Sequence, residues 1–213
     1  MHYNIHTHSF SGNKEIVELV NQYPRDTDTS LPYFTVGIHP WYINEAHLDE
    51  ELRLMEQCMP LQACRAIGEC GFDKRIDIPM DLQKKALIPQ LQLAEKYKKP
   101  VILHCVGAYQ EIIALKKQLR LTVPMVVHGF SKNAQVAESL WKNGFYLSFG
   151  KYLLLNPELG GVLKTVPLEQ LFLETDTMEQ SIFEVYGKAE SILNRNLESV
   201  IEDNFNKVFN QQF

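Results

Sequence analysis

The sequence predicts an α/β fold, specifically a TIM-like (β/α) barrel with about seven strands. Short apolar runs alternate with segments of helical periodicity along the chain, as is typical of parallel strands covered by helices. Candidate metal ligands follow both the first and the last run, and a closed or nearly closed barrel brings those two strand ends together most simply. We expect a single domain over residues 1–213.

Seven short runs are predicted as strands. Those that are apolar throughout are expected to be buried on both faces, as in a parallel sheet with helices on each side. The seven runs are residues 3–5, 33–38, 66–68, 101–103, 125–127, 145–149 and 171–175.

Five segments between or after these runs have apolar residues at helical spacing, and the last has the strongest pattern. The second contains Pro89, which should kink or divide its helix. The fourth is expected to use Ser131 as its N-cap and Gly144 as its C′ residue. The five segments are residues 45–58, 82–97, 108–119, 131–144 and 197–209.

Composition excludes several classes of protein. A net charge of -5 argues against stable nucleic-acid binding through a broad basic surface, although a metal-dependent nuclease remains compatible with it. No apolar stretch approaches a membrane span, and the first residues show no secretion signal, so we expect a cytoplasmic protein without membrane association. Cys58, Cys64, Cys70 and Cys105 form no CxxC pair and are expected to be reduced thiols.

Six candidate metal ligands each follow an apolar run. In a parallel sheet covered by helices, chemistry collects where the carboxyl ends of the strands meet the loops. Four imidazoles and two carboxylates without a thiolate suit a divalent metal and point to metal-assisted hydrolysis. We expect one or two ions, and Zn²⁺, Mn²⁺, Ni²⁺ or Fe²⁺ suit this ligand set better than Mg²⁺, which is kept as an option. The six residues are His6, His8, Glu69, His104, His128 and Asp176.

Each candidate also has an ordinary structural interpretation. Side chains alternate along a strand, so His6 and His8 point to the same side, but an HxH pair alone is often only a surface or core feature. Glu69 could be a capping or salt-bridged glutamate, although its flanking glycines allow close backbone approach. The metal interpretation is favoured because five separate strand ends all carry suitable ligands.

The ligands lie within six short motifs. The most distinctive are Gly-Glu-Cys-Gly-Phe-Asp at 68–73 and Leu-Glu-Thr-Asp at 173–176. In their order along nearly the whole chain, the six motifs resemble those of the TatD family, metal-dependent hydrolases of the amidohydrolase superfamily usually described as deoxyribonucleases. The remaining four motifs lie at 4–8, 37–40, 100–104 and 127–131.

The resemblance implies a TIM-like barrel, a one- or two-metal centre and phosphodiester hydrolysis. Only some thirty residues separate positions 8 and 37, too few for the family's usual second strand and two helices, so a shortened barrel is expected. Val106 stands where Arg, a bidentate phosphate donor, is common, which puts the family's substrate in question. The other departures are Asn4 for Asp, Gly129 for Cys, and Thr177-Met178 for Ala-Pro.

The expected reaction is hydrolysis of a phosphodiester, DNA included, or of a phosphoester by metal-activated water. Glu69 is expected to bridge two ions and to be part of the catalytic machinery. Asp176 is the candidate general base because it can contact both metal and water. One ion is assigned to His6, His8 and Asp176, and the other to His104 and His128.

Two further residues are candidates for substrate binding. His39 is the candidate contact for a substrate phosphate, and the alternative is a histidine fixed by the turn at Pro40. Lys151 could replace the charge of the missing arginine, although a lone lysine is more often simply solvated.

Three other functions stay open. A related amidohydrolase could cut C–N or C–O bonds in a small metabolite, although Glu69 occupies the place of a carbamylated lysine. A phosphoesterase of the polymerase-and-histidinol-phosphatase kind resembles the chain only at its first motif. A non-catalytic metal-binding or partner-binding relative is compatible with Asn4 and Val106.

Overall fold

The computed structural model describes residues 1–210, in which eight strands alternate with helices and are hydrogen-bonded in sequence order. The pairs β1–β2, β3–β4, β4–β5 and β7–β8 are parallel. The strands are β1 (His2–Thr7), β2 (Ile16–Gln22), β3 (Phe34–Val36), β4 (Cys64–Asp73), β5 (Val101–Val106), β6 (Met125–Val127), β7 (Phe145–Phe149) and β8 (Leu171–Leu173).

A parallel bridge between Thr7 and Asp176 links the end of β1 to the segment after β8. Because these strands are the first and last of the sheet, the strand order is that of a (β/α) barrel. The predicted fold class is confirmed.

The predicted number of strands was too low, because β2 was missed. Its sequence, Ile-Val-Glu-Leu-Val-Asn-Gln, carries two polar residues that are nevertheless buried. Glu18 is 6% exposed and accepts hydrogen bonds from the backbone N–H and hydroxyl of Ser11, both at 2.9 Å, which satisfies its carboxylate. In the described chain only a short 3₁₀ turn, η1 (Pro24–Asp26), separates β2 from β3 in place of helices.

The described chain divides into two compact units. The first comprises residues 1–20 and 126–210, and the second comprises residues 21–125. The prediction of a single domain stays a prediction.

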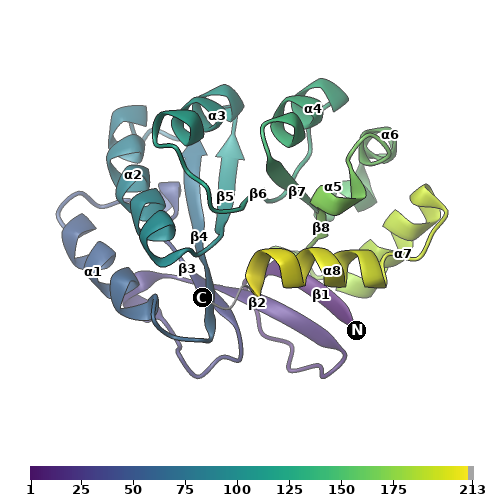
Figure 1. Cartoon of the computed structure of the whole chain (residues 1–213), viewed down its shortest axis with the longest axis horizontal. Helices are drawn as coiled ribbons and strands as arrows, with labels where there is room; N and C mark the ends of the chain where they lie inside the picture. The colour runs from purple at the N-terminus through teal and green to yellow at the C-terminus, as the bar shows by residue number, and fades with distance from the viewer. Residues whose placement is uncertain (211–213) are drawn as a thin grey trace. The chain divides into compact units, whose positions relative to one another are not determined.

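In the second unit, α2 (Met80–Tyr97) packs against β4 and α1 (Leu48–Cys58) packs against α2 (Figure 1). The unit also contains α3 (Tyr109–Gln118), which follows β5 and packs against it. Helix α2 is continuous across Pro89, so its predicted division was wrong. The carbonyl that loses its helical partner belongs to Lys85, an exposed residue.

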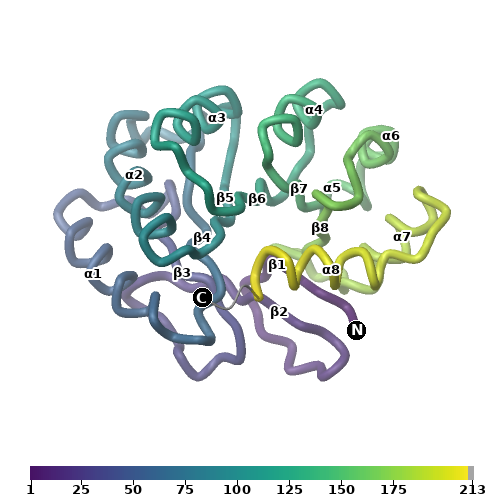
Figure 2. Tube along the Cα trace, in the orientation of Figure 1, coloured from purple at the N-terminus to yellow at the C-terminus, as the bar shows by residue number. Residues whose placement is uncertain are grey.

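In the first unit, α8 (Glu198–Phe209) lies along β1 and β8 (Figure 2), and the Met1 ammonium donates to Glu198 Oε2 at 3.1 Å. The unit's other helices are α4 (Ala134–Lys142), α5 (Lys151–Leu155), α6 (Leu159–Leu163) and α7 (Ile182–Leu193). A 3₁₀ turn, η3 (Leu168–Gln170), precedes β8.

The helix ends follow local capping chemistry. Asn133, not Ser131, caps α4, because its side chain accepts the Val136 N–H at 3.0 Å. Gly144 follows with φ +74°, as predicted for a C′ glycine. Helix α7 was missed although Ser181 and Glu184 form a capping box at its start.

All four cysteines are buried free thiols. None of the helices in residues 1–210 combines the length and apolar character that a membrane span needs.

Candidate metal centres

The first unit brings His6, His8 and Asp176 together; these three residues are called the first group. The Asp176 N–H donates to the His6 carbonyl at 2.9 Å, and the His8 N–H donates to the Asp176 carbonyl at 3.3 Å. Asp176 Oδ1 then lies 3.4 Å from His8 Nε2 and 3.7 Å from His6 Nε2. The backbone bonds between the end of β1 and the segment after β8 therefore align the three ligand side chains.

Asn4 holds the backbone next to Asp176. Its side-chain amide donates to Thr175 Oγ1 at 2.8 Å, and its Oδ1 accepts the Thr175 N–H at 3.0 Å. Asp176 has φ +55°, a left-handed conformation that Asp adopts more readily than most residues and that this pairing supports. Asn4, one of the departures from the family pattern, thus has a structural role that uses both ends of its amide.

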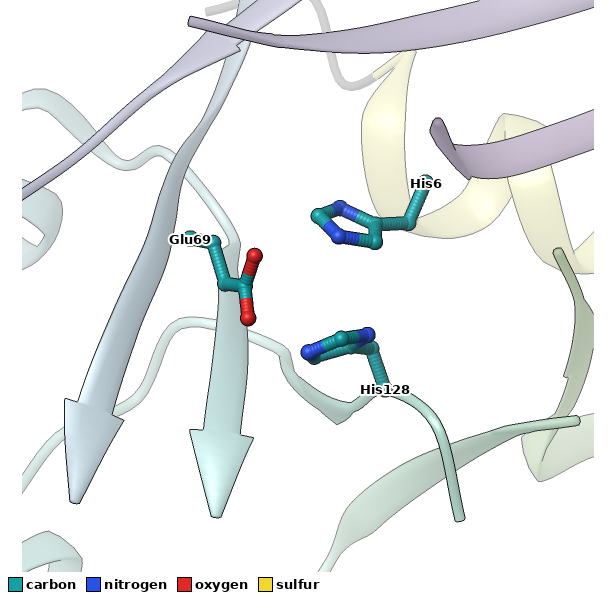
Figure 3. Close-up of side chains that lie close together, drawn as sticks. All are labelled: His6, Glu69 and His128. Carbon is teal, nitrogen blue, oxygen red and sulfur yellow. The ribbon is translucent and has the colours of Figure 1, made fainter. Parts of the chain in front are cut away.

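His128 follows β6, and its ring lies close to that of His6 in the same unit, with centroids 4.2 Å apart. Figure 3 shows these two side chains near one another and also draws Glu69 on β4 of the second unit. His128 Nδ1 lies 3.2 Å from Glu174 Oε1, which also accepts the Gly129 N–H at 2.7 Å. A carboxylate can only accept, so Nδ1 carries the proton, and the lone pair of a neutral ring lies on Nε2. Carboxylates orient metal-binding histidines in this way.

The second unit brings His39, Glu69 and His104 together as the second group. Glu69 Oε1 lies 2.9 Å from His104 Nδ1 and 3.1 Å from His39 Nε2. The Glu69 backbone N–H donates to Asn21 Oδ1 at 2.6 Å. Gly71, with φ +147°, is required because a Cβ there would lie 1.9 Å from the His104 carbonyl oxygen.

His39 acts as a hydrogen-bond donor within the second group. Its Nδ1 accepts the backbone N–H of Trp41 at 3.1 Å, so that nitrogen has no proton. The proton of the neutral ring is then on Nε2, which donates to Glu69. The neutral ring consequently orients Glu69 and offers no lone pair from Nε2 to an ion. The predicted phosphate contact of His39 stays a prediction.

His104 lies between two carboxylates. Its Nε2 is 3.1 Å from Asp73 Oδ2, and its Nδ1 is 2.9 Å from Glu69 Oε1. A neutral imidazole has one N–H and cannot donate to both, so this arrangement calls for an imidazolium or for a cation between Nδ1 and Glu69. Burial alone would raise the Asp73 pKa, but hydrogen bonds from Trp41, the Arg75 backbone and His104 outweigh it and lower the pKa.

Two buried glutamines of α2 anchor the backbone at Asp73 and next to His39. Gln83 accepts the Asp73 N–H at 2.8 Å and donates to the Asp73 carbonyl at 2.9 Å. Gln90 accepts the Ile38 N–H at 2.8 Å, directly before His39. Helix α2 therefore fixes the positions of both His39 and Asp73.

The distances in both groups fit divalent ions. Ligands about 2.1 Å from one ion lie about 3.4 Å apart at tetrahedral angles and about 3.0 Å apart at octahedral angles. The first group has separations of 3.4 and 3.7 Å, and the His104–Glu69 pair has 2.9 Å. The ligand atoms within each group lie within 4.8 Å of one another. Nitrogen and oxygen donors without sulfur match the chemistry expected from the sequence.

The remaining predicted site residue, Lys151, is exposed at the start of α5 in the first unit. Several residues that support the ligands were missed, among them Asp73, Glu174 and Trp41. Asp73 and Glu174 lie inside the two most distinctive motifs, so the motifs marked them. Nothing local distinguishes a supporting carboxylate from a ligand.

Comparisons with known proteins identify the family. A model of the TatD related DNase family matches residues 2–210. The chain belongs to this family. It is 32% identical over 149 residues to the "uncharacterized metal-dependent hydrolase YabD" of Bacillus subtilis, covering 68% of this chain and 58% of YabD. It is also 32% identical over 148 residues to the "3'-5' ssDNA/RNA exonuclease TatD" of Cronobacter sakazakii, covering 67% of this chain and 56% of the exonuclease.

The fold is shared with a solved TatD homologue. The crystal structure of YjjV from Escherichia coli superposes with a TM-score of 0.85 at 23% identity, covering 99% of this chain and 98% of that one. In sequence, YjjV is 32% identical over 155 residues, covering 70% of this chain and 60% of YjjV. The aligned region spans about three fifths of the length of these curated relatives.

Proposed function

We propose that this TatD-family chain is a metal-dependent hydrolase that cleaves phosphodiester bonds at the ends of nucleic-acid strands. The observation that carries the proposal is the pair of His/carboxylate groups, one in each unit, with separations that suit divalent ions. The family and the names of its relatives, a metal-dependent hydrolase and an exonuclease, support the reaction class.

In this proposal, His6, His8 and Asp176 hold one ion, and Glu69 and His104 are ligands for a second. A bound divalent metal supplies a Lewis acid that lowers the pKa of water toward about 7. The Asp176 side chain is 34% exposed, so its carboxylate can accept a proton from the attacking water.

The supporting residues keep the ligands in position for this chemistry. His39 and the Asn21–Glu69 backbone bond hold Glu69, and Asp73 holds His104. Such partners typically change metal affinity ten- to a hundredfold when they are removed. Glu174 orients His128, whose Nε2 is proposed as a further ligand.

The proposal is tested by steady-state hydrolysis of single-stranded DNA, a dinucleotide and bis(p-nitrophenyl) phosphate. Zn²⁺, Mn²⁺, Ni²⁺ and Mg²⁺ are added one at a time, and protein purified without added ions is analysed for metal. We expect turnover only with metal and loss of turnover in Asp176→Asn. The predicted contact of Lys151 with the substrate would appear as a modest rise in KM in Lys151→Ala.

Absence of turnover on every phosphodiester with metal bound would contradict the proposal. Turnover of a small amide or lactone instead would favour the amidohydrolase alternative. Glu69 as a bridge between two ions stays a prediction, which the EPR spectrum of the protein loaded with two Mn²⁺ tests, because a shared carboxylate couples the two spins.

A further inference from the structure

The 3₁₀ turn η2 (Pro40–Tyr42) carries two exposed aromatic side chains directly after His39. Trp41 is 52% exposed and Tyr42 is 58% exposed. Single exposed aromatic residues are common on protein surfaces and need no functional explanation by themselves. What distinguishes Trp41 is how its ring is held.

Both N–H groups of Trp41 donate to residues at the second group. The indole N–H donates to Asp73 Oδ2 at 2.8 Å, and the backbone N–H donates to His39 Nδ1 at 3.1 Å. Asp73 is itself buried and bound to His104. The ring is thus exposed yet held in one orientation, which reduces the entropy lost when a ligand stacks on it.

The ring also lies beside two residues of the second group, His39 and the proposed ligand His104. Its centroid is 5.1 Å from that of His39 and 5.8 Å from that of His104, with the rings edge to face. A phosphate bound at the second group would therefore have its neighbouring substituent next to Trp41. In a nucleic acid that substituent is a nucleoside, whose base presents a flat ring that stacks on aromatic side chains.

We propose that Trp41 is a stacking platform for a nucleobase of the substrate, a role that rests on the proposed phosphodiesterase function. Val106 stands where the family commonly has an arginine, so it cannot bind the substrate phosphate through charge. Stacking on Trp41 would compensate for part of that lost binding free energy. Stacking on one aromatic residue is typically worth about ten- to a hundredfold in affinity.

The test compares a dinucleotide with its fully abasic analogue, in which both bases are removed and the phosphodiester is kept. In the metal-loaded protein, Trp41→Leu should lower kcat/KM on the dinucleotide about ten- to a hundredfold more than on the abasic analogue, because any loss that acts through Asp73 affects both substrates equally. Trp41→Tyr, which keeps an aromatic face, should recover most of the loss. Tyr42→Leu is the matched control, because Tyr42 is equally exposed, and it should show no loss that depends on the base.

Fluorescence gives a measurement independent of turnover. The chain has two tryptophans, so Trp141→Phe leaves Trp41 as the only reporter. Thymidine monophosphate should quench this signal, whereas deoxyribose 5-phosphate should not.

Equal losses on both substrates in Trp41→Leu would overturn the platform and show that Trp41 acts only through Asp73. Equal wild-type rates on both substrates would also overturn it. Base-dependent quenching without hydrolysis of any phosphodiester would support the platform and contradict the proposed function, so the two failures are distinguishable.

Discussion

The two ligand groups differ in exposure and support. In the first group, the His8 and Asp176 side chains are 24% and 34% exposed, and main-chain hydrogen bonds align them. In the second group, the side chains of Glu69 and His104 are 4% and 12% exposed, and neighbouring side chains fix their orientation. Buried, pre-oriented ligands lose less entropy on binding an ion, whereas exposed ligands exchange it more readily.

These differences indicate that the two groups have different roles. The second group is built to retain an ion, and the first is open enough to exchange protons and water around Asp176.

The largest effect is expected for Glu69→Ala. The variant should not bind metal at the second group. Its kcat/KM should fall about a thousandfold or more, because the missing ion supplies several kcal/mol of transition-state stabilisation. Metal analysis and steady-state kinetics measure both losses. The apo protein should melt at an equal or slightly higher temperature, since a buried carboxylate at a site costs stability. Strong destabilisation of the apo variant would instead make Glu69 a structural residue.

Asp73→Asn should weaken metal binding at the second group about ten- to a hundredfold and leave the first group unchanged. The reason is that an amide in place of the carboxylate accepts more weakly from both Trp41 and His104. Competition with a fluorescent chelator measures both affinities in one titration. In the wild type, the chelator should remove the ion of the first group before that of the second, and the reverse order would contradict the comparison.

Val106→Arg should raise kcat/KM on a phosphodiester by up to about tenfold. Val106 ends β5 opposite Asp73 and offers no charged donor, whereas a hydrogen bond from a charged group to phosphate is worth about 1.5–3 kcal/mol. Val106→Leu is the control for size alone. High wild-type activity combined with a neutral or harmful Val106→Arg would show that the substrate phosphate is bound in another way.

A further prediction, on stability alone, concerns a carboxylate outside both groups. Burial alone would raise the Glu95 pKa, but hydrogen bonds from Lys98, Thr122 and Val123 lower it to about 2 from an ordinary value of 4.5. This stabilisation is complete above about pH 4.5 and is lost as the pH falls toward 2. Because solvent screens the carboxylate partly, Glu95→Gln should cost about 1–2 kcal/mol at pH 7.

Urea unfolding of wild type and Glu95→Gln at several pH values measures the difference. The free energies of unfolding of the two proteins should converge as the pH falls from 4.5 to 2. A difference in the free energy of unfolding that stays constant over that range would assign the loss to packing. Equal free energies of unfolding at pH 7 would show that the Glu95 carboxylate does not stabilise the fold.

The sequence by itself determined the types of ligand and most of the strands that carry them, but not the strand ends, because β4 and β5 continue past Glu69 and His104. Apolar runs and helical periodicity are local properties, so β1, β4 and β8 could be predicted without knowledge of their neighbours. The alternation of side chains along a strand likewise predicts that His6 and His8 point to one side. Strand β2 escaped prediction because its buried polar residues depend on partners such as Ser11.

Only the tertiary structure decided what supports the ligands. The contact of His39 with Glu69, the support of His104 by Asp73 and the anchoring of Asp73 to Trp41 all depend on pairs at least 30 residues apart in sequence. A hydrogen bond forms only where folding brings donor and acceptor within about 3 Å, and no local pattern encodes that distance. For this reason the sequence predicts a ligand set, whereas the structure distinguishes ligands from the residues that orient them.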